Sequence, residues 1–90
     1  MKRLNFTIEV WQKGNLFLAS APELDFIAQG QTSEEAKKNL SEIIRIQFEE
    51  MTEMGTLEEY LAECGFVVKG DRIIPQKEII GFEKSVVVMN

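Results

Sequence analysis

Apolar side chains occupy every second position near the start of the chain: Leu4, Phe6, Ile8 and Val10. A period of two is typical of a strand with one covered face. We therefore expect a strand over Leu4 to Val10, with Trp11 on its opposite face. A turn and the apolar run Leu16 to Ala19 predict the returning arm of a hairpin. After a proline break, a third short strand is expected from Phe26 to Gln29.

The pattern changes to a helical period after the third predicted strand. Thr32 and Glu35 form a capping box, in which the Thr32 hydroxyl accepts a backbone hydrogen bond and Glu35 reaches back. Seven apolar residues then share one helical face: Ala36, Leu40, Ile43, Ile44, Phe48, Met51 and Met54. Gly55 follows where a left-handed C-terminal cap belongs. A helix over Ser33 to Met54 is predicted.

The last third of the chain contains weaker signals. A second capping box, Thr56 to Glu59, predicts a short helix that stops near Gly65. Two apolar runs around Gly70 predict a tight hairpin, because this glycine can adopt a positive φ. The tail from Glu78 to Met89 is apolar on both faces, so we expect a strand that adds to the sheet or to a neighbouring subunit. Its expected oligomer-interface residues are Ile80, Phe82, Val86 and Val88.

These elements predict an α+β fold in one domain, residues 1–90. A βββα core is expected over residues 1–55, and a short helix, hairpin and C-terminal strand over 56–90. The length of 90 residues, with 44% hydrophobic and 28% charged residues, fits one globular unit. A domain of this size buries only about 60 to 65% of its unfolded surface, so we expect a homo-oligomer.

Cysteine usage and hydropathy bear on the compartment. The single cysteine, Cys64, cannot form an intrachain disulfide, which favours a reducing environment. No apolar run approaches the roughly 18 residues that span a bilayer, and the first residues do not form a signal-peptide core. We therefore expect a cytoplasmic protein without membrane contact.

The net charge of -5 is concentrated in the predicted helices. Residues 34–63 contain nine glutamates against Lys37, Lys38 and Arg45, a net of -6, whereas the remainder carries +1. An acidic surface repels phosphate backbones and attracts basic proteins, so direct DNA or RNA binding by this region is not expected. The alternative is that the glutamates form an ordinary helix face exposed to solvent, with no partner.

Candidate chemistry is sparse. The chain has no histidine, which removes His-based acid–base pairs, the common nucleophile–histidine systems and most zinc sites. Glu9, Glu23 and Asp25 would bind a metal only if they converged, and nothing in their spacing requires this. Cys64 has no neighbouring cation to lower its pKa and is interpreted as a core residue. No enzymatic activity, metal or cofactor is expected.

Two apolar residues outside the predicted core are candidate contacts for a partner. Trp11 lies on the uncovered strand face, and aromatic residues are enriched at interface hot spots. Ile46 is an aliphatic residue on an acidic helix face. The predicted partner-binding set is Trp11, Glu9, Ile46, Glu49, Glu50 and Glu53. The alternatives are a Trp that covers a strand edge and an isolated exposed isoleucine.

Residues 15–50 contain an ordered series of short motifs. The strand end Phe17 to Ala19 leads to Pro22-Glu23-Leu24, then to Gln29-Gly30, Thr32 and the helix opening Glu34-Glu35-Ala36. This order resembles the core of the HicB family of antitoxins. The resemblance implies a three-stranded sheet with a packed helix, a partial RNase H-like unit that lacks the catalytic carboxylates. It also implies that the chain binds and silences a HicA mRNA-cleaving toxin.

The chain departs from the family pattern at two places. Asp25-Phe26-Ile27 stands where family members commonly have a Pro-Gly-Cys-like group. Residues 56–90 show no recognition helix of a ribbon-helix-helix or helix-turn-helix module, so operator binding is not expected. The leading hypothesis is an antitoxin that covers the RNA-binding surface of a HicA-like toxin. The alternative is a stand-alone homo-oligomeric HicB-like module that binds a small or unknown ligand.

Overall fold

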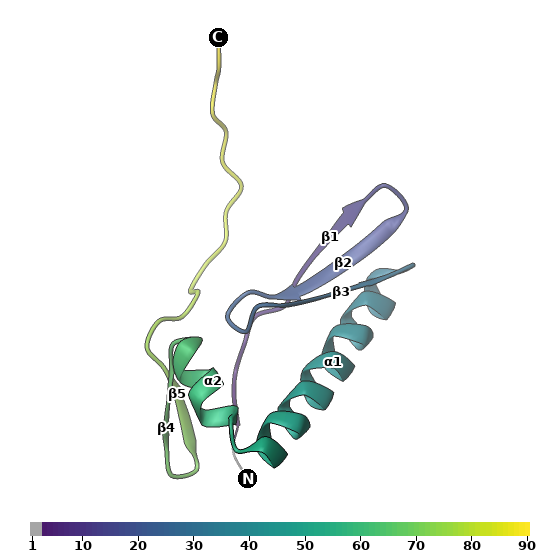
Figure 1. The fold of residues 1–90 in the computed structure, drawn as a ribbon. Helices are drawn as coiled ribbons and strands as arrows, with labels where there is room; N and C mark the ends of the chain where they lie inside the picture. The colour runs from purple at the N-terminus through teal and green to yellow at the C-terminus, as the bar shows by residue number, and fades with distance from the viewer. Residues whose placement is uncertain (1–2) are drawn as a thin grey trace.

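The computed structural model describes residues 3–90 and has an α+β fold (Figure 1). The elements in chain order are β1 (Glu9–Lys13), β2 (Leu16–Ala21), β3 (Phe26–Gly30), α1 (Ser33–Met54), α2 (Leu57–Glu63), β4 (Phe66–Lys69) and β5 (Arg72–Pro75). The first three strands form an antiparallel sheet in the order β1-β2-β3. α1 covers one face of this sheet, while β4 and β5 form a separate hairpin beside α2 (Figure 1).

The main core is built from small residues of the sheet and larger residues of α1. Ala19, Ala21 and Ala28 are buried on the sheet face that α1 covers. A Cβ added to Gly30 would lie 2.6 Å from the backbone nitrogen of Ala36, closer than such atoms approach. These small side chains therefore bring the α1 backbone close to β2 and β3, and Leu40 fills the space that remains, fully buried.

The predicted helix Ser33–Met54 is confirmed, with both of its caps. The Thr32 hydroxyl accepts a hydrogen bond from the Glu35 N–H at 3.0 Å, and the Glu35 carboxylate accepts one from the Gln31 N–H at 3.0 Å. Gly55 ends the helix with φ 72°. The expectation that Met54 belongs to the core face is wrong, since its side chain is 74% exposed. The last turn of α1 extends beyond the end of the sheet (Figure 1).

The second predicted capping box does not form. α2 begins at Leu57, but the Thr56 side chain makes no capping hydrogen bond and its ψ is 0° instead of extended. The Thr56 N–H donates to the Met51 carbonyl at 2.8 Å, which completes the C-terminal motif of α1. One residue cannot serve both helices in the conformation that each requires, and the longer helix determines its backbone.

The predicted first strand is wrong in its bounds. Pairing begins at Glu9, and residues 4–8 form no strand. Leu4 and Phe6 alternate because they pack, half-buried, against the core. The Thr7 N–H donates to the Glu23 carboxylate at 3.0 Å instead of to a neighbouring strand. Arg3 forms an isolated parallel bridge with Arg72, so this segment runs from the hairpin to the sheet.

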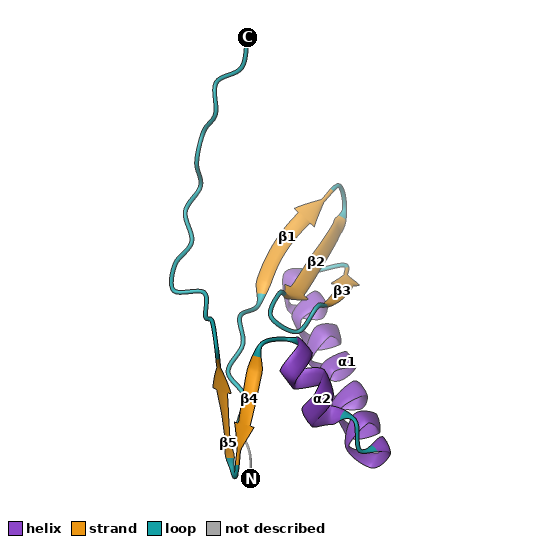
Figure 2. Ribbon diagram, turned by 60° about the vertical axis from the view of Figure 1, so that its left-hand side comes forward, coloured by secondary structure: helices purple, strands orange, loops and turns teal. Residues whose placement is uncertain are grey.

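The C-terminal hairpin is confirmed, but the C-terminal strand is not. β4 and β5 pair around a turn with Gly70 at φ 60°. Residues 76–90 form no strand in this chain. Residues 77–79 lie near Pro22 and Glu23, and the C-terminal part of the segment extends away from the β4–β5 hairpin (Figure 2). The tail, which we define as Ile79 to Met89, therefore does not add to the sheet of its own chain.

Candidate protein-binding surfaces

The face of the three-stranded sheet that points away from α1 carries an apolar patch. Val10 pairs with the buried Ala19, so Trp11, paired with Leu18, lies on the opposite face. Trp11 is 42% exposed, as expected for a residue outside the core. The side chain of Leu16 shares this face and is exposed as well. No helix covers this patch in the part of the chain that the structure describes (Figure 1).

A groove lies between β3 and α1, and apolar side chains from both elements line it. Ile27, 55% exposed, lines it from β3, and Ile46, 46% exposed, lines it from α1. Ile43 and Glu42 complete the α1 wall, and the groove encloses about 430 Å³. We call this surface the β3–α1 groove. The Asn39 side-chain amide donates to the Gln29 carbonyl at 2.9 Å, which closes one end of the β3 edge.

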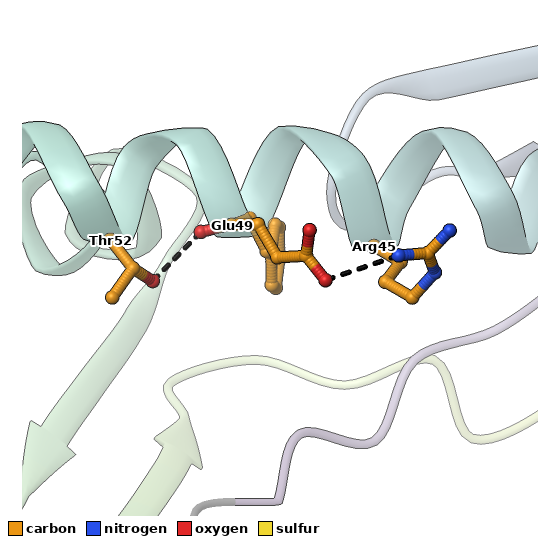
Figure 3. A network of polar contacts seen from close by, with 4 residues as sticks. Arg45, Glu49 and Thr52 are labelled. Atoms are coloured by element: carbon orange, nitrogen blue, oxygen red, sulfur yellow. Dashed lines mark hydrogen bonds and ion pairs between the residues drawn. The ribbon is translucent and has the colours of Figure 1, made fainter.

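The acidic residues of α1 differ in how they are paired. Arg45 donates to the Glu49 carboxylate at 3.1 Å, one turn along the helix (Figure 3). Both side chains of this ion pair are exposed, so the pair contributes only a few tenths of a kcal/mol to the free energy of unfolding. Glu42, Glu50 and Glu53 have no ion-pair partner among residues 3–90. Acidic residues of α1 without an ion-pair partner among residues 3–90 therefore lie beside the β3–α1 groove, at Glu42, and along the last turns, at Glu50 and Glu53.

The predicted partner-binding set divides into two surfaces. Glu9 and Trp11 lie on the outer face of β1. Ile46, Glu49, Glu50 and Glu53 lie on α1, which covers the other face of the sheet. Sequence reasoning missed Ile27, because a five-residue strand with apolar side chains on both faces has no period that marks one face as exposed. The groove exists only because β3 and α1 are adjacent.

Glu23 serves a structural role. Besides the backbone contact, the Thr7 hydroxyl donates to the Glu23 carboxylate at 2.7 Å. Partial burial raises the pKa of Glu23, but the hydrogen bonds from Thr7 outweigh it, and the pKa lies below its ordinary value of 4.5. Glu9, Glu23 and Asp25 do not come together as a group, since no three potential metal ligands converge within residues 3–90.

Tyr60 and Cys64 lie where α2 meets the sheet. The Tyr60 hydroxyl donates to the Leu24 carbonyl, and its ring lies 6.0 Å from that of Phe26. Burial raises the pKa of Tyr60 to about 12. Burial likewise raises the pKa of the Cys64 thiol, although a hydrogen bond with Tyr60 opposes this. A thiol with a raised pKa is a poor nucleophile at neutral pH. Cys64 packs against the core, as predicted.

An apolar cavity of about 300 Å³ lies between the N-terminal segment, the end of α1, α2 and the hairpin. Its walls include Leu4, Phe6, Phe48, Leu57, Val68 and Ile73. The size is at the lower limit for sites that hold small organic molecules. Among residues 3–90, Glu58 is the only charged residue of these walls, so the described part of the cavity offers no convergent set of polar groups.

The predicted oligomer-interface residues all lie on the tail. Ile80 is 96% exposed, Val88 is 87% exposed, and Phe82 and Val86 are exposed as well. They occupy alternate positions, so in an extended chain they point to one side. Ile79, at the start of the tail, is the least exposed of its large apolar residues and lies near Pro22 and Glu23. The tail is thus attached at one end only.

Comparisons with known proteins identify no relative. No protein-family model, curated protein or solved structure matches the chain with significance. The resemblance to HicB antitoxins therefore stays a prediction. Within residues 3–90, no helix is both long enough and apolar enough to span a bilayer.

Proposed function

We propose that this chain is a non-catalytic protein-binding module of the HicB antitoxin type, which holds a basic HicA-like toxin and covers its RNA-binding surface. The observation that supports this best is the β3–α1 groove. The exposed side chains of Ile27 and Ile46 line this groove, and the acidic side chain of Glu42 lines it with them. A basic partner with one apolar anchor would match the groove in both shape and charge.

The acidic residues of α1 differ in whether they are free to bind a partner. Glu42, Glu50 and Glu53 are available to a cationic partner, whereas Glu49 already pairs with Arg45. Rim charges mainly set the association rate, and a buried apolar anchor sets the dissociation rate. In this proposal, Ile46 and Ile27 therefore slow the dissociation of the partner, and the glutamates accelerate its association.

The test measures binding kinetics against the product of an adjacent short reading frame that encodes a basic, double-stranded-RNA-binding-like protein with a catalytic histidine. Ile46→Asp should accelerate dissociation by about 10- to 100-fold, the effect of losing one apolar anchor. Met54→Asp is the matched control, since it adds the same charge to an exposed apolar position of α1 outside the groove.

Charge reversal provides the second arm of this test. Glu50→Lys with Glu53→Lys should slow association and weaken its dependence on salt. Glu59→Lys with Glu63→Lys on α2 is the control for net charge, since both residues are exposed and the change in charge is the same. If Ile46→Asp and the double reversal both bind and neutralise the toxin like the parent, the β3–α1 groove is not the contact surface. If no such reading frame exists, the antitoxin function itself is wrong.

The apolar cavity favours the second candidate function, a stand-alone module that binds a small apolar ligand. The cavity walls come from four parts of the chain, so an occupant would raise the thermal stability of the whole fold. A concentration-dependent rise of Tm with small aliphatic or aromatic compounds, abolished by Val68→Trp, would support this candidate. A Tm that no such compound changes would count against it.

A further inference from the structure

The two edges of the three-stranded sheet are unequal. At the β3 edge, α1 lies alongside and Asn39 already occupies the Gln29 carbonyl. At the β1 edge, all five residues are exposed, and no strand pairs with the outer side of β1 within residues 3–90. An open strand edge presents unpaired N–H and C=O groups to any extended chain of suitable shape.

The hydrogen-bond pattern indicates which β1 groups face this open edge. The Gln29 carbonyl points away from β2, toward Asn39, so the Leu18–Gln29 pair is a non-hydrogen-bonded pair. Because the pattern alternates across β2, the Trp11–Leu18 pair exchanges hydrogen bonds. The backbone groups of Val10 and Gln12 therefore point to the open edge.

Each side of β1 carries one exposed apolar side chain near this edge. Val10 is 39% exposed on the side of α1, which contacts β1 little. Trp11 is exposed on the outer side, next to Leu16. A strand added here would be flanked by uncovered apolar groups above and below the sheet, so it would need apolar side chains on both of its faces.

The tail has this property. Val86 and Val88 point to one side of an extended chain and Val87 and Met89 to the other, and all four are exposed. The run of residues 85–89 is uncharged and as long as β1, so it opposes neither Glu9 nor Lys13 with a like charge. Its β-branched valines are strand formers.

The structure also indicates that the pairing is with a second copy. The Cα radius of gyration is 15.5 Å, against about 12 Å for a compact domain of 90 residues, because the tail projects from the body. In Figures 1 and 2 the tail and β1 run in the same direction, so pairing within one chain would be parallel. A second copy can approach the antiparallel sheet in the opposite direction, and antiparallel pairing is the commoner and slightly more stable form.

We propose that residues 85–89 of one copy form a strand that pairs with the open edge of β1 in a second copy, reciprocally, to give an arm-exchanged homodimer. Val86 to Met89 cover Val10 on one side of the partner's sheet and Trp11 on the other. The exchange is independent of the proposed antitoxin function, since the β3–α1 groove lies at the opposite edge. Loss of dimerisation can therefore be measured without loss of toxin binding, and loss of toxin binding without loss of dimerisation.

The test compares the full-length chain with two blocked variants, using light scattering over a range of concentrations. The parent should have twice the 10.3 kDa mass of one chain. Val86→Asp with Val88→Asp blocks the tail and should weaken the dimer at least 100-fold, because each arm loses two buried valines. Met54→Asp, which places a charge on an exposed apolar residue elsewhere, should stay dimeric.

Gln12→Pro blocks the edge. Proline removes a donor that points outward and leaves the β1–β2 ladder intact, so it should give a folded monomer, whereas Gln12→Ala stays dimeric. Mixing the Gln12→Pro chain with the Val86→Asp and Val88→Asp chain should restore a heterodimer, since one intact arm then meets one intact edge. Hydrogen exchange at Val10 and Gln12 should be slow only in the dimer.

Three results would overturn the proposal. A parent monomer with slow exchange at Val10 and Gln12 would mean that the tail pairs with its own sheet. A Gln12→Pro chain that dimerises like the parent would place the tail elsewhere on the second copy. A dimer that survives the Val86→Asp and Val88→Asp changes would exclude the tail from the interface.

Discussion

β3 and β1 are the two edge strands of one small sheet, and they differ in what covers them. α1 packs along β3 so closely that Gly30 has no room for a side chain. β1 has few contacts with α1, and every one of its residues is exposed. α1 lies over β3 and β2, so β1 is left at the margin of a helix whose diameter with side chains is about 10 to 12 Å.

Stability and binding are located on different sides of this sheet. The covered side contains the fully buried Leu24 and Leu40, so it carries most of the folding free energy. The open side contains apolar groups that are left in water, so it has the capacity to bind. Substitutions on the two sides should therefore affect different measurements.

The largest effect is expected in the core under α1. Leu40→Ala should lower the free energy of unfolding by about 2 to 5 kcal/mol, because it removes a fully buried side chain and leaves a cavity. Val10→Ala on the open side should cost less than about 1 kcal/mol. Urea unfolding measures both, in chains that also carry Val86→Asp and Val88→Asp so that β1 stays uncovered. Equal losses would remove the distinction between the two sides.

The close approach of β3 and α1 should be nearly as sensitive. Gly30→Ala places a Cβ within 3 Å of the α1 backbone, so the helix must shift, at about 1 to 3 kcal/mol. Gly81→Ala is the matched control, because nothing lies within 4 Å of its added Cβ. Thermal unfolding measures the stability of both variants. A Gly30→Ala variant as stable as Gly81→Ala would mean that the contact is not tight in solution.

The contact between α2 and the covered side depends on Tyr60. Tyr60→Phe leaves the Leu24 carbonyl without its donor and should cost about 1 to 2 kcal/mol. The pKa of Tyr60 is raised in the fold from 10.0 to about 12. Its contribution is therefore complete below pH 10 and is lost as pH rises through about 12. Stability measured from pH 8 to 12 should decline less steeply in Tyr60→Phe than in the parent.

The smallest effect is expected at the base of the open side, where Thr7 and Glu23 join the segment before β1 to the turn before β3. Glu23→Gln should cost about 1 kcal/mol at neutral pH, the value of one exchanged hydrogen bond. The pKa of Glu23 is lowered by the fold, so its contribution is present above pH 4.5 and is lost as pH falls through the lowered pKa. Urea unfolding at a series of acidic pH values should show that Glu23→Gln loses less stability on acidification than the parent. If the stability of both chains falls in the same way with pH, Glu23 does not have this role.

Local patterns of the sequence were sufficient for most elements. The capping box at Thr32, the apolar stripe and Gly55 predicted α1 with its observed bounds, because caps and helical periodicity are set within a few residues. Gly70 predicted the β4–β5 hairpin for the same reason. Of the candidate contacts, the exposure of Trp11 and Ile46 followed from their position relative to the apolar pattern.

Other features depend on contacts between distant residues, and the sequence alone could not determine them. The alternation from Leu4 to Val10 looks like a strand, yet Thr7 bonds to Glu23, sixteen residues away, and pairing begins only at Glu9. The position of α1 across the sheet decides that Ile27 and Ile46 line one groove and that Trp11 lies elsewhere. It also leaves β1 open, because a helix covers only the strands that its axis crosses, and an amphipathic stripe does not say which strands those are.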